Sequence, residues 1–285
     1  MNHKEDYSNK KVLIGLSGGI NSMALLCHLS DYPEYYRPKE IHLFYAHFKE
    51  HSPDTLGFVL AGVEYAKRMF KNVTYIQTDN SVLEFFKEQK MIPHPVIAPC
   101  TRILKIIPMA KYMVDNDIDI DLVGYVKEEA RRIANMRKKN ESNFNTKQFP
   151  ISTESNEWCF DIVKKEIGWY PKIYDLMWSD VGFISYVTEN LHRLPDDVKK
   201  RIIKKLGKDK RVFTHNNCLP CKNMQLDDMI AVEFFYKDYW DAASNLSEEL
   251  QKHWGRQKNE FYTTFGRQDH ETNYQKQSCG VCALD

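Results

Sequence analysis

A short segment near the amino terminus combines glycines and hydroxyl-bearing residues in an order suited to binding phosphate. It reads Ser17-Gly18-Gly19-Ile20-Asn21-Ser22. Glycines let the backbone come close to an anion, successive backbone N–H groups can point at its oxygens, and the two serines can donate hydroxyl hydrogen bonds. Because no Gly-Lys-Ser/Thr sequence and no third glycine follows, this is neither a Walker loop nor a dinucleotide-binding turn. A tight turn of small residues used only for packing is the alternative.

The cysteines form a second group of residues capable of chemistry. Four of the seven stand in two Cys-x-x-Cys pairs, Cys218 with Cys221 and Cys279 with Cys282. Two thiolates three residues apart can chelate one metal, as zinc or as part of an iron–sulfur cluster. A structural zinc bound by all four thiolates and a set of free, reduced cysteines are both open alternatives. Cys27 and Cys159 stand in apolar or mixed surroundings, and we expect them to be packing residues.

The phosphate-binding segment is flanked by the elements that would position it. Residues 11–16 form a short apolar run typical of a buried strand, and a helix should begin at Asn21 or Ser22 and reach Leu29. A helix N-terminus directed at the segment would add partial positive charge. Further strands are predicted over residues 41–46, 73–76 and 118–124, with helices over residues 56–70 and 100–114, the second opened or kinked by Pro108. This alternation predicts an α/β fold with a mainly parallel sheet covered on both faces.

The second half of the chain has a different pattern. Residues 138–157 are polar, which predicts a long loop and a division into a nucleotide-binding domain over residues 1–150 and a mostly helical region over residues 151–285. Residues 172–174 could form one more strand, and Ser179 could cap a following helix, with Asp180 in its first turn. The chain closes with a polar tail over residues 266–285.

Composition excludes several classes of protein. Of the 285 residues, 42% are hydrophobic and 28% charged, as in a globular protein, and the formal net charge of +1 gives no global field that would attract nucleic acid. We find no signal peptide and no membrane-length apolar run, and we predict a cytoplasmic protein. The basic runs are most simply solvated helix faces: Arg131, Arg132, Arg137, Lys138, Lys139, and Lys199, Lys200, Arg201, Lys204, Lys205, Lys208, Lys210, Arg211.

The strand, the Ser-Gly-Gly-x-x-Ser segment and the following helix together resemble the PP-loop of the ATP pyrophosphatase superfamily. This resemblance implies a Rossmann-like fold of the adenine nucleotide alpha hydrolase type, binding of ATP with Mg²⁺, and adenylation of a substrate with release of pyrophosphate. The chain departs from the family at Asn21, where the family often has aspartate. That departure bears on magnesium binding and on turnover.

Further segments, in order along the chain, are similar to the phosphoadenosine-phosphosulfate (PAPS) reductase branch of that superfamily. They are residues 51–55, 100–108, 124–132, 178–181 and 218–221. This resemblance implies catalytic roles for Lys105 and Arg131, whose charged groups suit phosphate or sulfate oxygens. It places Ala46, His47, Gly124 and Arg132 at the nucleotide together with residues 17–22. Lys127 stands one residue away from a position where the family more often has arginine.

The same resemblance gives the cysteines specific roles. In cluster-bearing members, a cysteine before the Lys-x-x-Pro segment joins the later Cys-x-x-Cys, so Cys100, Cys218 and Cys221 would bind a 4Fe-4S cluster. Those members have two adjacent cysteines there, whereas Pro99 precedes Cys100 here. The fourth ligand would then be Cys279, Cys282 or an exogenous thiol, or it would be absent and leave an open iron suited to activating sulfur. The tail at residues 278–282 is also similar to the mobile nucleophilic tail of sulfonucleotide reductases, with Cys279 as the nucleophile.

Three functions follow from these patterns. The first is ATP-dependent adenylation coupled to iron–sulfur-assisted sulfur transfer, onto a nucleobase or a nucleic-acid backbone, with a separate sulfur donor. In this function the basic runs would contact phosphates of the acceptor. The second is reduction of a sulfated adenine nucleotide, in which Cys279 attacks and a thioredoxin-like protein regenerates it. The third is an adenine-nucleotide-binding module with structural zinc and no turnover. The retained Ser-Gly-Gly sequence favours the first over the second, because sulfonucleotide reductases do not cleave ATP.

Overall fold

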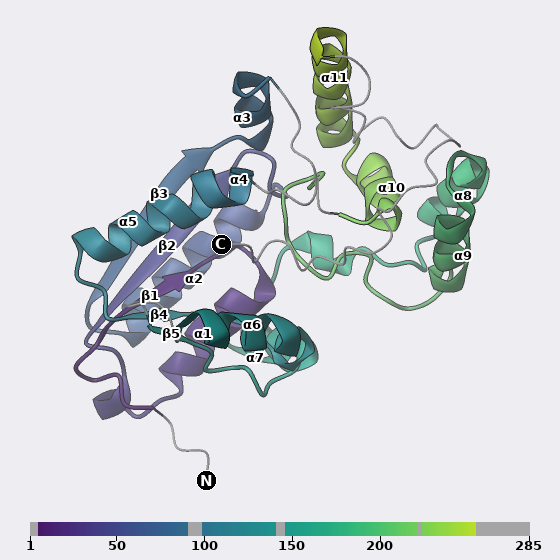
Figure 1. Cartoon of the computed structure of the whole chain (residues 1–285). Helices are drawn as coiled ribbons and strands as arrows, with labels where there is room; N and C mark the ends of the chain where they lie inside the picture. Colours follow the sequence, from purple (N-terminus) through teal and green to yellow (C-terminus); the bar gives the residue numbers. More distant parts are fainter. Residues whose placement is uncertain (1–4, 91–98, 141–145, 222–223, 255–285) are drawn as a thin grey trace. The chain divides into compact units, whose positions relative to one another are not determined.

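The computed structural model describes residues 5–90, 99–140, 146–221 and 224–254 and groups the chain into two compact units (Figure 1). The first contains residues 1–47, 53–80 and 103–171, and the second contains residues 48–52, 81–102 and 172–285. The units therefore interleave along the chain. The division into residues 1–150 and 151–285 stays a prediction.

The first unit is built on a five-stranded sheet of order β3-β2-β1-β4-β5. β1 pairs in parallel with both β2 and β4, and β4 pairs in parallel with β5. In this register Leu13 lies beside His42 on one side and Asp121 on the other. The α/β fold predicted from the sequence is confirmed. The strands are β1 (Lys11–Gly15), β2 (Glu40–Phe48), β3 (Val73–Asn80), β4 (Ile120–Leu122) and β5 (Thr146–Gln148).

Both faces of this sheet are covered. Consecutive side chains of the central strand point to opposite faces, and Val12, Leu13 and Ile14 are all fully buried. On one face, Met109, Tyr112 and Met113 pack with Leu13 and Phe44. Among the other helices, α1 packs against both α7 and α2 (Figure 1). The helices of this unit are α1 (Ile20–Ser30), α2 (Thr55–Met69), α5 (Ile107–Asp115), α6 (Ala130–Asn140) and α7 (Asn156–Glu166), with short turns η1 (Glu34–Tyr36) and η3 (Lys127–Glu129).

Four local predictions need correction. The polar crossing after residue 138 contains a strand, β5. Residues 172–174, predicted as a strand, belong to the 3₁₀ turn η4 (Lys172–Asp175). Asp180, not Ser179, caps the next helix, since its carboxylate accepts the Phe183 N–H at 2.7 Å. The helix predicted from residue 100 is broken into α4 (Pro99–Thr101), the π-helical turn η2 (Arg102–Ile106) and α5, with Pro108 in the first turn of α5.

The second unit is mostly helical, as predicted. Its core contains the fully buried side chains Trp178 and Phe183, and the Phe183 ring lies 4.8 Å from that of Phe235. No helix among the described residues is long and apolar enough to cross a membrane. The helices are α3 (Val82–Glu88), α8 (Val181–Asn190), α9 (Asp196–Lys205), α10 (Leu226–Phe235) and α11 (Lys237–Trp254), with the 3₁₀ turn η5 (Leu191–Arg193).

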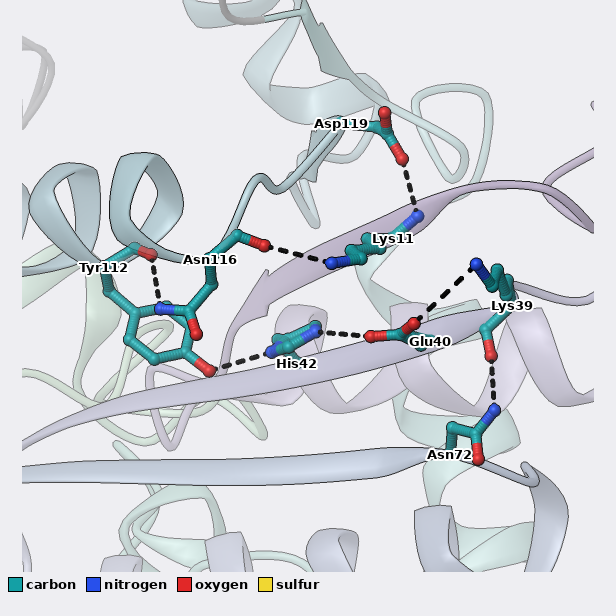
Figure 2. Close-up of polar contacts among 8 residues, drawn as sticks. All are labelled: Lys11, Lys39, Glu40, His42, Asn72, Tyr112, Asn116 and Asp119. Carbon is teal, nitrogen blue, oxygen red and sulfur yellow. Dashed lines mark hydrogen bonds and ion pairs between the residues drawn. The ribbon is translucent and has the colours of Figure 1, made fainter.

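Polar contacts stabilise the sheet of the first unit near the amino-terminal ends of β1 and β2 (Figure 2). The backbone N–H of Lys11 donates to the Asp119 carboxylate at 2.8 Å. Beside it, the buried His42 imidazole lies between the Tyr112 hydroxyl, 2.8 Å from Nδ1, and the Glu40 carboxylate, 3.6 Å from Nε2 (Figure 2). Because Tyr112 belongs to α5 and the other two to β2, this cluster ties that helix to the sheet.

The His42 cluster should make stability depend on pH. Burial lowers the pKa of His42, and the Glu40 carboxylate only partly opposes this effect. A histidine whose pKa is lower in the folded state stabilises the fold above its unfolded pKa of about 6.5, and that contribution is lost as the pH falls through the folded value. Urea unfolding should therefore show a smaller loss of free energy from pH 7.5 to 5.5 in His42→Phe than in wild type. His192→Gln, at an exposed histidine, should keep the wild-type slope; an unchanged slope in His42→Phe would contradict the assignment.

Candidate functional site

The strand order reverses at β1, the central strand of the sheet. β1 pairs with β2 on one side and with β4 on the other. In open α/β sheets, ligands bind outside the carboxyl ends of the strands at the point where the strand order reverses. Residues 16–19 leave β1 at this point, and Val123 and Gly124 leave β4 beside it. The sequence-predicted phosphate segment thus lies where such a fold binds ligands.

Hydrogen bonds within the segment preform its shape. Gly18 has a φ of +75°, a conformation that favours glycine. The largely buried Ser22 hydroxyl donates to the Gly19 carbonyl at 3.0 Å and accepts the Ser17 N–H at 3.2 Å. Ser17 Oγ in turn accepts the Gly19 N–H at 3.2 Å. The segment is therefore a closed turn whose geometry exists before any ligand arrives.

The N-terminus of α1 is suited to an anion. Its N-cap residue, Gly19, offers no side-chain cap, and no acidic residue stands in the first turn. The first N–H groups of a helix have no partner within the helix, and the helix dipole gives this end partial positive charge. Phosphate oxygens are the natural partners for such an end. Ile20, Asn21 and Ser22, all predicted nucleotide-binding residues, form this first turn.

Gly124 lets the chain after β4 come into close contact with that turn. A Cβ atom at Gly124 would lie 2.7 Å from the Asn21 carbonyl oxygen, 2.9 Å from the Asn21 carbonyl carbon and 3.1 Å from the Ser22 nitrogen. All three are backbone atoms of a helix, which cannot move aside as a flexible side chain can. The predicted involvement of Gly124 in the site therefore has a steric basis, although the sequence did not indicate this contact.

A carboxylate that the sequence analysis did not select also reaches this turn. Asn21 Nδ2 donates to Glu129 Oε2 at 3.3 Å, and Glu129 also accepts a hydrogen bond from the Arg132 guanidinium. The Arg132 guanidinium lies over the Tyr125 ring, 4.4 Å from its centroid. Asn21 Oδ1 is buried and has no hydrogen-bond partner among the described residues. Glu129 stands within the segment 124–132 that resembles the PAPS reductase branch, and that segment was the available signal for it.

Comparison with known proteins adds little to this geometry. No family model and no curated protein matches the chain. Among solved structures, a similarity is found to the U34-tRNA thiolase NcsA from Methanococcus maripaludis with its [4Fe-4S] cluster. The two share 13% sequence identity, the match covers 97% of this chain and 81% of that one, and the TM-score is 0.39. At that TM-score the similarity supports no argument about function, and the site is interpreted from its own residues.

The other predicted nucleotide-site residues lie on different elements of the first unit. Ala46, near the end of β2, is partly buried against the cluster around Leu13. His47 follows it, with Nδ1 3.0 Å from the Tyr45 hydroxyl and its carbonyl bound by Asn80 at 3.2 Å. Lys105 is half-buried on the π-helical turn, and Arg131 is exposed on α6. Their roles at a nucleotide, and catalysis by Lys105 and Arg131, stay predictions.

The predicted cluster ligands Cys100, Cys218 and Cys221 all belong to the second unit. Within it, Glu50 O accepts the Leu219 N–H at 2.7 Å, and the Ser52 hydroxyl donates to Asn216 Oδ1 at 3.3 Å, so residues 50–52 support this Cys-x-x-Cys segment. Among the described residues, however, no three His, Cys, Asp or Glu side chains are grouped so as to hold a metal ion. The cluster and the zinc alternative therefore stay predictions.

The remaining cysteines divide into two sets. Cys279 and Cys282 lie outside the described residues, so the tail nucleophile and the fourth-ligand prediction stay predictions. Cys27 and Cys159 are fully buried, as expected for packing residues. Burial raises the pKa of each thiol to about 12, so neither is a thiolate at neutral pH.

Proposed function

We propose that the first unit binds the triphosphate of ATP at residues 17–22, at the carboxyl end of β1. The observation that carries this proposal is the preformed turn at residues 17–22, closed by the Ser22 hydroxyl and continuous with a helix N-terminus that has no acidic residue. This turn lies at the position where the strand order reverses. A purely structural turn would not need a positively polarised helix end that has neither a side-chain cap nor an acidic residue in its first turn.

We further propose that the bound ATP is used to adenylate an acceptor, with release of pyrophosphate, as a step in sulfur transfer to a nucleobase or nucleic-acid backbone. In this reaction the helix N-terminus and the serine hydroxyls would bind the phosphates that leave, and the electrostatic field of fixed dipoles would stabilise their developing charge. Arg132, which pairs with Glu129, lies in the first turn of α6 and would add positive charge. No step of this proposal depends on a metal cluster.

Magnesium ordinarily accompanies ATP and prefers oxygen ligands. Two protein oxygen donors stand beside the loop, the Glu129 carboxylate and Asn21 Oδ1, which has no hydrogen-bond partner among the described residues. These residues fit a magnesium ion brought in by the phosphates. Glu129 would then supply the negative charge that the loop lacks at Asn21.

A second candidate function rests on the same pair. Because Asn21 carries no charge and its amide is already bound to Glu129, the site could bind adenine nucleotides without turning them over. Pyrophosphate release from ATP with sulfide and RNA present would favour the enzyme. Nucleotide binding with no pyrophosphate under any condition would favour the module. Sulfite release from a sulfated nucleotide with thioredoxin would instead indicate the reductase.

Ser22→Ala should weaken ATP binding. The change removes the hydroxyl that holds Ser17 and Gly19 in the turn, and each such hydrogen bond is worth about 1 kcal/mol, so calorimetry should show Kd for ATP rising by about tenfold. Ser30→Ala is the matched control, because it removes a buried hydroxyl at the other end of α1, bound to the Cys27 carbonyl at 2.6 Å. It should lower stability but leave Kd unchanged. Equal Kd values in wild type and Ser22→Ala, or no binding of ATP by wild type, would refute the proposed site.

A further inference from the structure

The basic residues between 199 and 211 separate into two groups in the second unit. The inner group is half-buried and has partners: Lys199 pairs with Asp196 at 3.0 Å, and Arg201 with Asp197 at 2.7 Å. Lys205 forms an ion pair with the fully buried Asp227, and Arg211 Nε donates to the Tyr174 carbonyl at 3.0 Å. These four cations are therefore used in the fold.

The outer group is Lys200, Lys204, Lys208 and Lys210, and we call it the outer lysine face. All four side chains are exposed. None of their ammonium groups forms an ion pair or a hydrogen bond with any residue in the described part of the chain. Ammonium groups without protein partners keep their full charge for an external anion. The basic run is thus not a uniformly solvated face.

The backbone holds these four lysines in defined places. Lys200 and Lys204 are one helical turn apart on α9, about 6 Å along its axis. Beyond the helix, Gly207 turns the chain with a φ of +74°, and its N–H donates to the Trp178 carbonyl at 2.9 Å. The Trp178 N–H returns a bond of 2.9 Å to the Lys210 carbonyl. Since Trp178 is buried, the loop that presents Lys208 and Lys210 is fastened to the core.

Few acidic groups oppose this charge. Asp209 stands exposed between Lys208 and Lys210, and Asp196, one helical turn before Lys200 on α9, pairs with Lys199 and also interacts electrostatically with Lys200. Asp197 and Asp227 are likewise occupied by the inner group. The face therefore carries a local excess of positive charge on a protein whose formal net charge is only +1.

We propose that the outer lysine face binds the phosphodiester backbone of a nucleic acid. Lysines act as point charges that contact phosphates without reading bases, and the spacing of about 6 Å between Lys200 and Lys204 suits two neighbouring phosphates of one strand. A membrane surface is a poorer partner, because amphipathic helices that bind lipid need a broad exposed apolar face. On α9, Val198 and Ile202 are buried in the core, and Ile203 is exposed among the lysines. This inference rests on the proposed function, in which the outer lysine face would bind the nucleic-acid acceptor.

The test compares two full-length variants that lose the same charge. One replaces Lys200, Lys204, Lys208 and Lys210 with glutamine; the control replaces four exposed lysines of the first unit that already have carboxylate partners, Lys67, Lys71, Lys111 and Lys165. Binding of a fluorescein-labelled 20-nucleotide single-stranded RNA is followed by anisotropy from 50 to 200 mM salt. Because each phosphate contact adds about 0.7 to the salt slope, the first variant should lose about 3 units of slope and bind at least tenfold more weakly at 50 mM salt.

The control should bind RNA as wild type does, and vesicles containing 20% phosphatidylserine should bind neither protein. Equal weakening in both variants, no RNA binding by wild type, or binding to vesicles in place of RNA would each overturn the proposal. Calorimetry with ATP separates this proposal from the proposed function, because the outer-face variant should keep wild-type Kd for ATP. RNA binding without any ATP binding would contradict the proposed function but not the assignment of the outer lysine face to RNA.

Discussion

Gly124→Ala is expected to reduce ATP binding by between tenfold and a hundredfold and to lower the melting temperature. The added Cβ would lie 2.7 Å from the Asn21 carbonyl oxygen, a distance that real Cβ atoms essentially never show. The turn must therefore shift away from the carboxyl end of β4. Overpacking of this kind costs about 1–3 kcal/mol, and here the strain falls on the first turn of α1, which would bind the phosphates. Calorimetry with ATP, together with thermal unfolding, measures both effects.

Gly57→Ala provides the matched control for this change. Its added Cβ would make only an ordinary contact of 3.8 Å with the Trp169 ring, and it lies in α2 of the same unit. It should leave Kd for ATP unchanged and not lower stability, since alanine favours helix more than glycine does. If Gly124→Ala bound ATP as tightly as Gly57→Ala, the close approach of Gly124 to α1 would have no part in nucleotide binding. Circular dichroism of both variants distinguishes a local shift from loss of the fold.

The central part of this site could be predicted from sequence because its signals are local. An apolar run, two glycines and a following stretch of mostly apolar residues lie within about twenty consecutive residues, and the structure has a strand, a turn and a buried helix there. Gly18 is a case in point, because its φ of +75° is what a glycine at such a turn predicts. Contacts between segments distant in sequence give no such signal. The approach of Gly124 to Asn21, about a hundred residues earlier, needs the sheet order and register.

Glu129 and β5 show why other features escaped prediction. A glutamate in a charged segment looks like any solvated residue, and only the fold brings it to Asn21. β5 is short and polar, so it lacks the alternation that marks a strand. It is stabilised by its partners: Lys147 forms an ion pair with the buried Asp121 of β4, and Gln148 accepts the Tyr7 hydroxyl at 2.9 Å. Residues 172–174 show the reverse error, because a short buried run does not by itself distinguish strand from helical turn.

Lys205→Met is expected to destabilise the second unit by about 2–4 kcal/mol. Asp227, its partner, has no exposed surface, and removing one member of a buried ion pair leaves the other charge uncompensated. Arg201 cannot replace Lys205 fully, because its guanidinium lies 3.8 Å from the other Asp227 oxygen and already pairs with Asp197. Lys205 also lies over the Trp178 ring, 5.0 Å from its centroid, so that contact is lost as well. Urea unfolding at pH 7 measures the change.

Neutralising Asp227 shows whether the loss of stability comes from its uncompensated charge or from a packing defect. Adding Asp227→Asn to Lys205→Met removes the stranded charge and should recover at least half of the lost stability, whereas a packing defect would not be repaired. Lys204→Met is the matched control, because Lys204 is exposed and belongs to the outer lysine face. This substitution should change the free energy of unfolding by less than about 0.5 kcal/mol. If Lys204→Met were as damaging as Lys205→Met, the division of these basic residues into structural and exposed groups would be wrong, and the reason to assign the outer lysines to an external anion would fail with it.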